Sequence, residues 1–238
     1  MVFQKKYIPL FVVAGIAVLF GILWYFQSQG VIKIFPSKED RRIQKILTID
    51  ESKFTPAEGL PAETFDAEIN KLYEQKEKVL ENPQNAQLWF DFAYTKQFLN
   101  DHEGAILSWE KSLELQPLNF LTAGNLGNTY QYFLKNYDKA EFYYLEALKI
   151  RPNYTIAFQG LLDIYRYNVP EKQGQIEPLM QLAIKNDPAN EAAYYYVLAD
   201  FFLSQNDMTK GKEYYEIVKS LNPEGAIELE ETYPQVKS

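Results

Sequence analysis

The chain has 238 residues, long enough for one domain with an appendage, and its 18 Tyr and 16 Phe supply ample apolar area for a packed core. Its net charge is −8, and residues 27–238 carry 22 basic against 32 acidic side chains, which argues against nucleic acid as a partner because nucleic acid selects clustered Lys and Arg. There is no cysteine, so disulfides, thiolate metal sites, a cysteine nucleophile and a lipid-modified cysteine are all excluded.

The N-terminus predicts a membrane anchor. After a short tail, residues 1–6, the stretch 7–26 contains no charged residue. A helix of that length spans about 30 Å, the thickness of the hydrocarbon layer. Tyr7 marks one end and Trp24, Tyr25 and Phe26 cluster at the other, as interfacial aromatic residues do. We therefore expect a single transmembrane helix over 7–26. A cleaved signal peptide is the alternative, but its apolar region would run only about 7–15 residues.

The charged residues on either side of this span support two opposite membrane orientations. Lys5 and Lys6 precede it, whereas Lys33, Lys38 and Arg41 are among the cations that follow, so the positive-inside rule favours repeats on the cytoplasmic side. A short Lys-Lys tail before one span instead resembles a bacterial signal-anchor. On that resemblance we expect the rest of the chain on the extracytoplasmic side. The span also holds a small-xxx-small pair, Ala17 and Gly21, which is typical of pairing helices.

Residues 27–63 are expected to form a linker or stalk. A short helix is predicted near 37–47, and Pro56, Gly59 and Pro61 interrupt the stretch between this helix and residue 63. Residues 64–83 are expected to form an N-terminal capping helix, because apolar residues recur there at helical spacing over 65–81. Thr64 is the predicted N-cap of this helix.

The remaining chain repeats with a period of about 35 residues. Five prolines mark the period: Pro83, Pro117, Pro152, Pro188 and Pro223. Small residues stand at fixed distances before the later prolines, as at Ala105, Ala140 and Gly211, and bulky ones follow at Trp109 and Tyr144. A period in this range is typical of a stacked helical repeat.

The pattern resembles the tetratricopeptide repeat (TPR), a helix–turn–helix unit of about 34 residues. Leu126, Gly127 and Tyr130 match the family's motif on the first helix of one repeat, and Trp89 matches it in the repeat before. The resemblance implies an all-α, TPR-type α-solenoid, a right-handed superhelix, preceded by the single transmembrane helix. It covers residues 84–223 as four repeats, about 84–118, 119–153, 154–189 and 190–223, with a C-terminal cap and tail over 224–238.

Each repeat is expected to contain two helices. The predicted first helices are 86–99, 120–133, 154–167 and 190–204, and the predicted second helices are 102–115, 137–150, 172–186 and 208–221. Asp101, Asn136 and Asp207 are predicted N-caps of second helices. The third repeat departs most, because Pro170 and Pro178 fall near the start of its second helix. That helix begins late, near Gly174, or is kinked.

No catalytic arrangement is found in the sequence. It has no Gly-rich phosphate loop, no paired histidines and no Gly-x-Ser-x-Gly, and nothing flanking the single histidine, His102, suggests a triad. We therefore expect a protein that is not an enzyme, with no catalytic residue, cofactor, metal or small-molecule substrate.

The resemblance implies a binding surface on the concave face of the first helices, where TPR proteins hold extended peptides or partner helices. The positions that match are Phe90, Tyr94, Gln97, Phe98, Asn125, Asn128, Gln131, Tyr132, Gln159, Asp163, Arg166, Tyr167, Tyr196, Asp200 and Ser204. Amides and aromatic rings dominate this set, which suits a peptide backbone and apolar side chains. Some family members clamp a C-terminal carboxylate with several cations, and here only Arg166 is available for that role.

The sequence thus predicts a membrane-anchored scaffold that binds partner proteins or peptides in its groove, for assembly of an envelope complex. Two alternatives stay open. One is a regulatory or accessory subunit of a membrane enzyme complex, and the other is a structural tether that oligomerises through its span.

Overall fold

The computed structural model describes the backbone of residues 10–29 and 36–237, and the side chains of 18–29 and 36–237. The chain divides into two compact units, residues 1–50 and residues 51–238. Within the described residues all regular structure is helical, so the all-α prediction is confirmed.

The first unit contains two helices, α1 (Leu10–Ser28) and α2 (Lys38–Ile46). The predicted tail 1–6, residues 7–9 of the predicted span and residues 30–35 of the predicted linker lie outside the described part. Among the residues that are described, no helix combines the length and apolarity required to cross a membrane. α2 begins at a capping box, in which the Ser37 side chain accepts from the Asp40 N–H and the Asp40 carboxylate accepts from the Ser37 N–H.

The second unit opens with a 3₁₀ turn at Glu51–Lys53 and then α3 (Ala62–Glu81), which packs against the first helix of the first repeat. The prediction that Thr64 caps α3 is wrong. The helix begins two residues earlier and its N-cap is Pro61, which makes no side-chain capping bond. Proline lacks an N–H and its φ suits a helix start, so Pro61 sets the boundary before Thr64 is reached.

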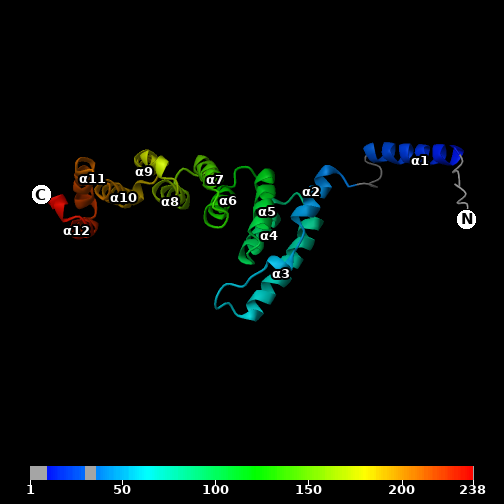
Figure 1. Cartoon of the computed structure of the whole chain (residues 1–238), viewed down its shortest axis with the longest axis horizontal. Coiled ribbons are helices and arrows are strands. Elements are labelled where there is room, and N and C mark those ends of the chain that lie inside the picture. Colours follow the sequence, from blue (N-terminus) through cyan, green and yellow to red (C-terminus); the bar gives the residue numbers. More distant parts are fainter. Residues whose placement is uncertain (1–9, 30–35, 238) are drawn as a thin grey trace, which may run out of the picture. The chain divides into compact units, whose positions relative to one another are not determined.

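The paired helices lie close to the predicted ranges (Figure 1). The first helices of the four pairs are α4 (Ala86–Phe98), α6 (Phe120–Tyr132), α8 (Thr155–Asp163) and α10 (Glu191–Ser204). The second helices are α5 (His102–Leu115), α7 (Tyr137–Ile150), α9 (Ile176–Asn186) and α11 (Met208–Leu221). Helices pack mainly on neighbours in the chain, as a solenoid requires.

The periodic prolines end the helices that precede them. Each of the five lies two residues beyond the last helical residue of α3, α5, α7, α9 or α11. The residue before each proline has φ between −129° and −144° and a positive ψ, outside the helical region. The proline ring disfavours helical geometry at the preceding residue, so each repeat ends at a defined position.

The turn inside a repeat has its own chemistry. Asn100, Lys135 and Asn206 have φ of 68°, 52° and 59°, and each immediately precedes a second helix's N-cap. Asn is among the residues that tolerate this left-handed region best. The predicted caps Asp101, Asn136 and Asp207 are confirmed, because their side chains accept from the N–H groups of Gly104, Lys139 and Lys210.

The third pair is irregular, as its sequence suggests. α8 is short and passes into a π-helical turn at Ile164–Asn168, followed by a 3₁₀ segment at Pro170–Gln175. α9 therefore begins late, at Ile176, and Pro178 falls in its first turn, where proline does not break a helix. This outcome matches the late-start alternative.

Tyr144 shows how neighbouring repeats are packed together. Its ring is fully buried. A Cβ added to Gly127 would lie 2.6 Å from Tyr144 Cδ1, and one added to Gly160 would lie 2.3 Å from Cζ. The two glycines, on α6 and α8, thus leave the space that the ring from α7 fills.

The chain after Pro223 folds as α12 (Pro223–Thr232) and a 3₁₀ turn at Pro234–Lys237. α12 contacts both α10 and α11, as α8 contacts both α6 and α7. It occupies the place that the first helix of a further repeat would take, which fits the expected capping helix.

Candidate protein-binding groove

The first helices of the first three repeats line two neighbouring cavities. The first cavity, about 300 Å³, lies between α4 and α6 and is lined by Tyr94, Gln97, Trp109, Asn125, Asn128, Thr129, Tyr132 and Phe133. The second cavity, about 350 Å³, is lined by Gln131, Tyr132, Lys135, Tyr137, Asp163, Tyr167 and Asn168. Tyr132 belongs to both, so the two cavities adjoin along one face.

The first cavity combines exposed aromatic rings with amides. Tyr94 is 60% exposed, and Tyr132 is 48% exposed. The amides of Gln97, Asn125 and Asn128 are partly buried. Amide groups both donate and accept hydrogen bonds, and aromatic rings offer rigid apolar area. This lining suits a backbone with alternating donors and acceptors better than a charged ligand.

Hydrogen bonds position several of these side chains. Tyr132 donates to Asp163 Oδ2 at 3.0 Å, which links the second repeat to the third. Partial burial, followed by this bond, raises the pKa of Tyr132 above its ordinary value, so the hydroxyl remains a donor at physiological pH. Asn128 Oδ1 and Gln131 Oε1 both lie 2.7 Å from the Tyr144 hydroxyl.

Trp109, which the repeat pattern marks only as a bulky position, also lines the first cavity. Its side chain is 2% exposed. Among the described residues its indole Nε1–H has no hydrogen-bond partner. At the matching position of the second repeat, the Tyr144 hydroxyl reaches two amide oxygens. Trp109 therefore holds a buried donor without the acceptors that Tyr144 has.

Several predicted residues lie outside both cavities. Phe90 is partly buried against the core, and Phe98, 40% exposed, lines neither cavity. Gln159 and Ser204 are exposed on α8 and α10, and the Ser204 hydroxyl donates to the Phe201 carbonyl.

The fourth repeat's groove positions are occupied by internal contacts. Arg166 donates to Asp200 Oδ2 at 2.5 Å and lies over the Tyr167 ring at 5.5 Å. Tyr233, which follows α12, donates to the other Asp200 oxygen at 2.9 Å. Tyr196 is partly buried beside Gly225 of α12. Because Asp200 already compensates Arg166, the one cation considered for a carboxylate clamp is neutralised.

His102, the single histidine, lies near the first cavity. Its ring is 3.9 Å from that of Phe133 between centroids, and its Nδ1 is 3.1 Å from Gln97 Oε1. Burial lowers the pKa of His102, so the neutral ring is the favoured form at neutral pH. Through Gln97 and Phe133 it supports the wall of the cavity.

Comparisons with known proteins agree with this architecture. The sequence model of the tetratricopeptide repeat family matches residues 122–154 and 192–224, which fall in the second and fourth predicted repeats. Human cilia- and flagella-associated protein 70 is 27% identical over 140 residues, 56% of this chain and 12% of that protein. The chain thus spans only a small part of that relative.

Solved structures show the same helical fold. The crystal structure of MamA has a TM-score of 0.54 at 17% identity, covering 73% of this chain and 94% of that one. The MamA RS-1 ArsTM double mutant has a TM-score of 0.50 at 20% identity, covering 69% and 86%. Together with the family matches, these findings support an all-helical, TPR-like solenoid, a fold that suggests a protein-interaction scaffold.

Proposed function

We propose that this chain is a single-pass membrane protein whose repeats bind extended segments of partner proteins in the two cavities, and that it serves assembly of an extracytoplasmic envelope complex. It binds without transforming its partners.

The buried indole of Trp109 is the observation that carries the binding site. A buried donor left without a partner costs about 1–3 kcal/mol. An extended peptide presents backbone carbonyl oxygens at regular intervals, and one of them seated in the first cavity would accept from Trp109 Nε1–H once the cavity lining moves to expose that atom. Asn125 and Asn128 would bond the adjoining backbone groups, and Tyr94 would cover an apolar side chain of the peptide.

The charge of the two cavities limits the kind of peptide that they can bind. Within the lining of the two cavities Lys135 is the single cation and Asp163 the single acid. A ligand recognised through a carboxylate or phosphate would need several cationic side chains in the site. An internal, mostly uncharged peptide segment therefore fits better than a charged chain end.

Membrane attachment rests on the uncharged run at residues 7–26 and on the part of α1 whose side chains are described. Val18, Leu19 and Phe20 are 61%, 61% and 57% exposed, and Trp24 is 69% exposed. Large apolar side chains seldom form a continuous exposed run unless another apolar phase covers them. A bilayer would do so.

Site-specific photo-crosslinking in membranes that contain the full chain tests the binding face. A benzophenone amino acid at Tyr94 should give partner adducts, whereas one at Phe142, 55% exposed on α7 and outside both cavities, should not. Trp109→Phe keeps an aromatic ring but removes the donor, so it should reduce the Tyr94 adducts several-fold, with a thermal melt confirming that the variant is still folded.

Equal adducts at both positions, or Tyr94 adducts that survive Trp109→Phe unchanged, would contradict the groove. Adducts obtained only from a probe at Gly21, within α1, would favour the structural tether instead.

A further inference from the structure

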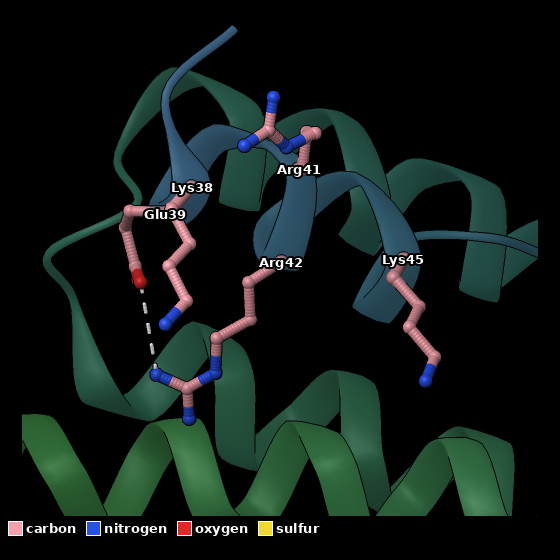
Figure 2. A pocket seen from close by; sticks show the side chains of 5 residues that line it. All are labelled: Lys38, Glu39, Arg41, Arg42 and Lys45. Carbon is pink, nitrogen blue, oxygen red and sulfur yellow. Dashed lines mark ion pairs between the residues drawn. The ribbon is translucent and has the colours of Figure 1, made fainter.

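The basic residues of α2 share one sector of the helix, although the Arg41 side chain turns away from the other three and donates to the Pro36 carbonyl at 3.3 Å (Figure 2). Lys38, Arg41, Arg42 and Lys45 fall within about 100° of the helix circumference, because each residue advances roughly 100° around an α-helix. All four are exposed. Together with Glu39 they line a hollow of about 780 Å³. Figure 2 shows Lys38, Arg42 and Lys45 extending from the same side of the helix.

The acidic residues of α2 are held in other roles. Asp40 lies away from the basic face and completes the capping box with Ser37 at 2.9 Å. Glu39 lies at the edge of the basic face, 3.7 Å from Arg42 (Figure 2). The acids therefore fix the start of the helix and one edge of the face, and the face as a whole stays cationic.

Charge divides the molecule at the boundary between the two units. Residues 1–50 carry seven Lys and Arg against three Asp and Glu, whereas residues 51–238 carry 17 against 29. An anionic surface would attract the first unit and repel the second. Nine residues separate Ser28 from Lys38, so chain connectivity keeps α2 within roughly 35 Å of the end of α1.

From this face, its charge and its tether we infer that α2 binds the phosphate-bearing headgroups of an anionic lipid surface. The tether part of the inference rests on the proposed span, whereas the cationic face does not. Basic clusters close to a span are drawn to anionic lipid in the leaflet on their own side, whichever side that is, and the attraction is confined to about a Debye length. α2 then lies on the membrane.

A fluorophore on α2 tests this directly, since the chain has no cysteine of its own. Gln44→Cys places a label on an exposed position of the helix without changing its charge. The labelled full chain is reconstituted into nanodiscs of phosphatidylcholine, with or without phosphatidylglycerol. Acrylamide, a neutral quencher, should quench the label less in the anionic discs, because lipid covers the bound helix. The ratio of bound to free helix should rise about tenfold there, and high salt should restore the quenching.

Two matched variants separate the face from net charge. Lys38→Glu/Arg41→Glu/Lys45→Glu should abolish the protection. Lys149→Glu/Lys185→Glu/Lys219→Glu changes the charge equally at exposed positions on second helices and should retain it. Circular dichroism melts confirm that both variants stay folded.

Equal quenching in neutral and anionic discs would overturn the inference. So would protection without lipid, which would assign the face to the acidic repeats, and so would competition by inorganic phosphate at low concentration, which would assign it to a soluble anion. If the chain does not remain in the discs, the proposed span is wrong. In that case the labelled chain can be mixed with anionic vesicles and its acrylamide quenching measured again. Unchanged quenching would refute lipid binding by α2.

Discussion

The second and third repeats differ most in the turn between their two helices. In the second, Lys135 takes a left-handed conformation and Asn136 caps α7, so two α-helices meet at a short, defined turn. In the third, Asp163 leads into a π-helical turn, a 3₁₀ segment follows, and α9 starts without a side-chain cap. The family model matches the second repeat and does not extend over the third.

The difference shows that a few residues at the turn decide the geometry of a whole repeat. Both repeats keep a buried bulky residue at the equivalent place, Tyr144 and Met180, although Ile176 stands in the third repeat where the second has the small Ala140. The third lacks the cap, and Pro170 cannot donate the backbone hydrogen bond of a regular turn. Cross-repeat contacts offset the loss, since the Tyr165 hydroxyl at 2.7 Å and the Lys172 amine both donate to Glu141 on α7.

The largest effect is expected at Tyr144, which fills the space between the second and third repeats. Tyr144→Ala should lower the free energy of unfolding by about 3–5 kcal/mol, because it empties a buried ring site flanked by two glycines. Chemical denaturation of the full chain measures this. Phe142→Ala on the exposed side of the same helix is the control, and a loss no greater than the control's would contradict the packing described.

The next effect compares two glycines. Gly127→Ala should cost about 1–3 kcal/mol, because its methyl group would meet the buried Tyr144 ring, which Gly160 confines from the other side. Gly174→Ala, in the irregular third repeat, has nothing within 4 Å and should stay within about 0.5 kcal/mol of the parent. Similar thermal midpoints for both variants would show that the two repeats are packed alike.

A smaller effect is expected at the helix caps. Asn136→Ala removes the acceptor for the Lys139 N–H and should cost about 1 kcal/mol. Gln175→Ala replaces the N-cap residue of α9, whose side chain makes no capping bond, and should change little. Amide hydrogen exchange in the first turns of α7 and α9 measures the contribution of each cap locally. Equal acceleration of exchange by the two substitutions would show that the two caps do not differ.

The smallest effect is pH-dependent and lies between the third and fourth repeats. Glu177 accepts from Lys210 and Tyr214, and these bonds lower its pKa below the ordinary value of about 4.5. A carboxylate with a lowered folded-state pKa contributes stability above its unfolded pKa, and loses it as pH falls through the folded value. Glu177→Gln should therefore be slightly less stable at neutral pH.

That deficit should shrink steadily below about pH 4.5 and vanish when the parent carboxylate is protonated. Thermal midpoints across the acid range measure it, with Glu171→Gln on the exposed 3₁₀ segment as control. A deficit that is constant with pH would mean that the ion pair is not its source.

Local chemistry explains why so much of the fold could be predicted. Proline at a fixed period ends each second helix, and Asp101, Asn136 and Asp207 cap the helices where their side chains were expected to do so. These effects involve residues within one turn of each other, so they can be read from sequence. Thr64 failed as a cap because Pro61 already starts the helix. The repeat boundaries and the superhelix's handedness stay predictions.

The candidate site was harder to predict because it depends on contacts between repeats. Tyr94, Asn125 and Asn128 line a cavity, and their binding of a partner stays a prediction. The engagement of Arg166 by Asp200 joins two repeats and has no local signal. Trp109 was missed as a lining residue because a bulky residue at its position was expected only to pack. The one difference visible in the sequence is that Trp109 carries an N–H donor where the matching residue, Tyr144, carries a hydroxyl.

α12 has a consequence for how copies of this molecule can associate. It covers α10 and α11 through Ala226 and Leu229, which are buried, while Glu224, Glu228 and Glu231 are exposed. A second copy could stack its repeats on this end only by displacing an already docked helix and by approaching three carboxylates. Head-to-tail growth into a filament is thereby opposed at the α12 face.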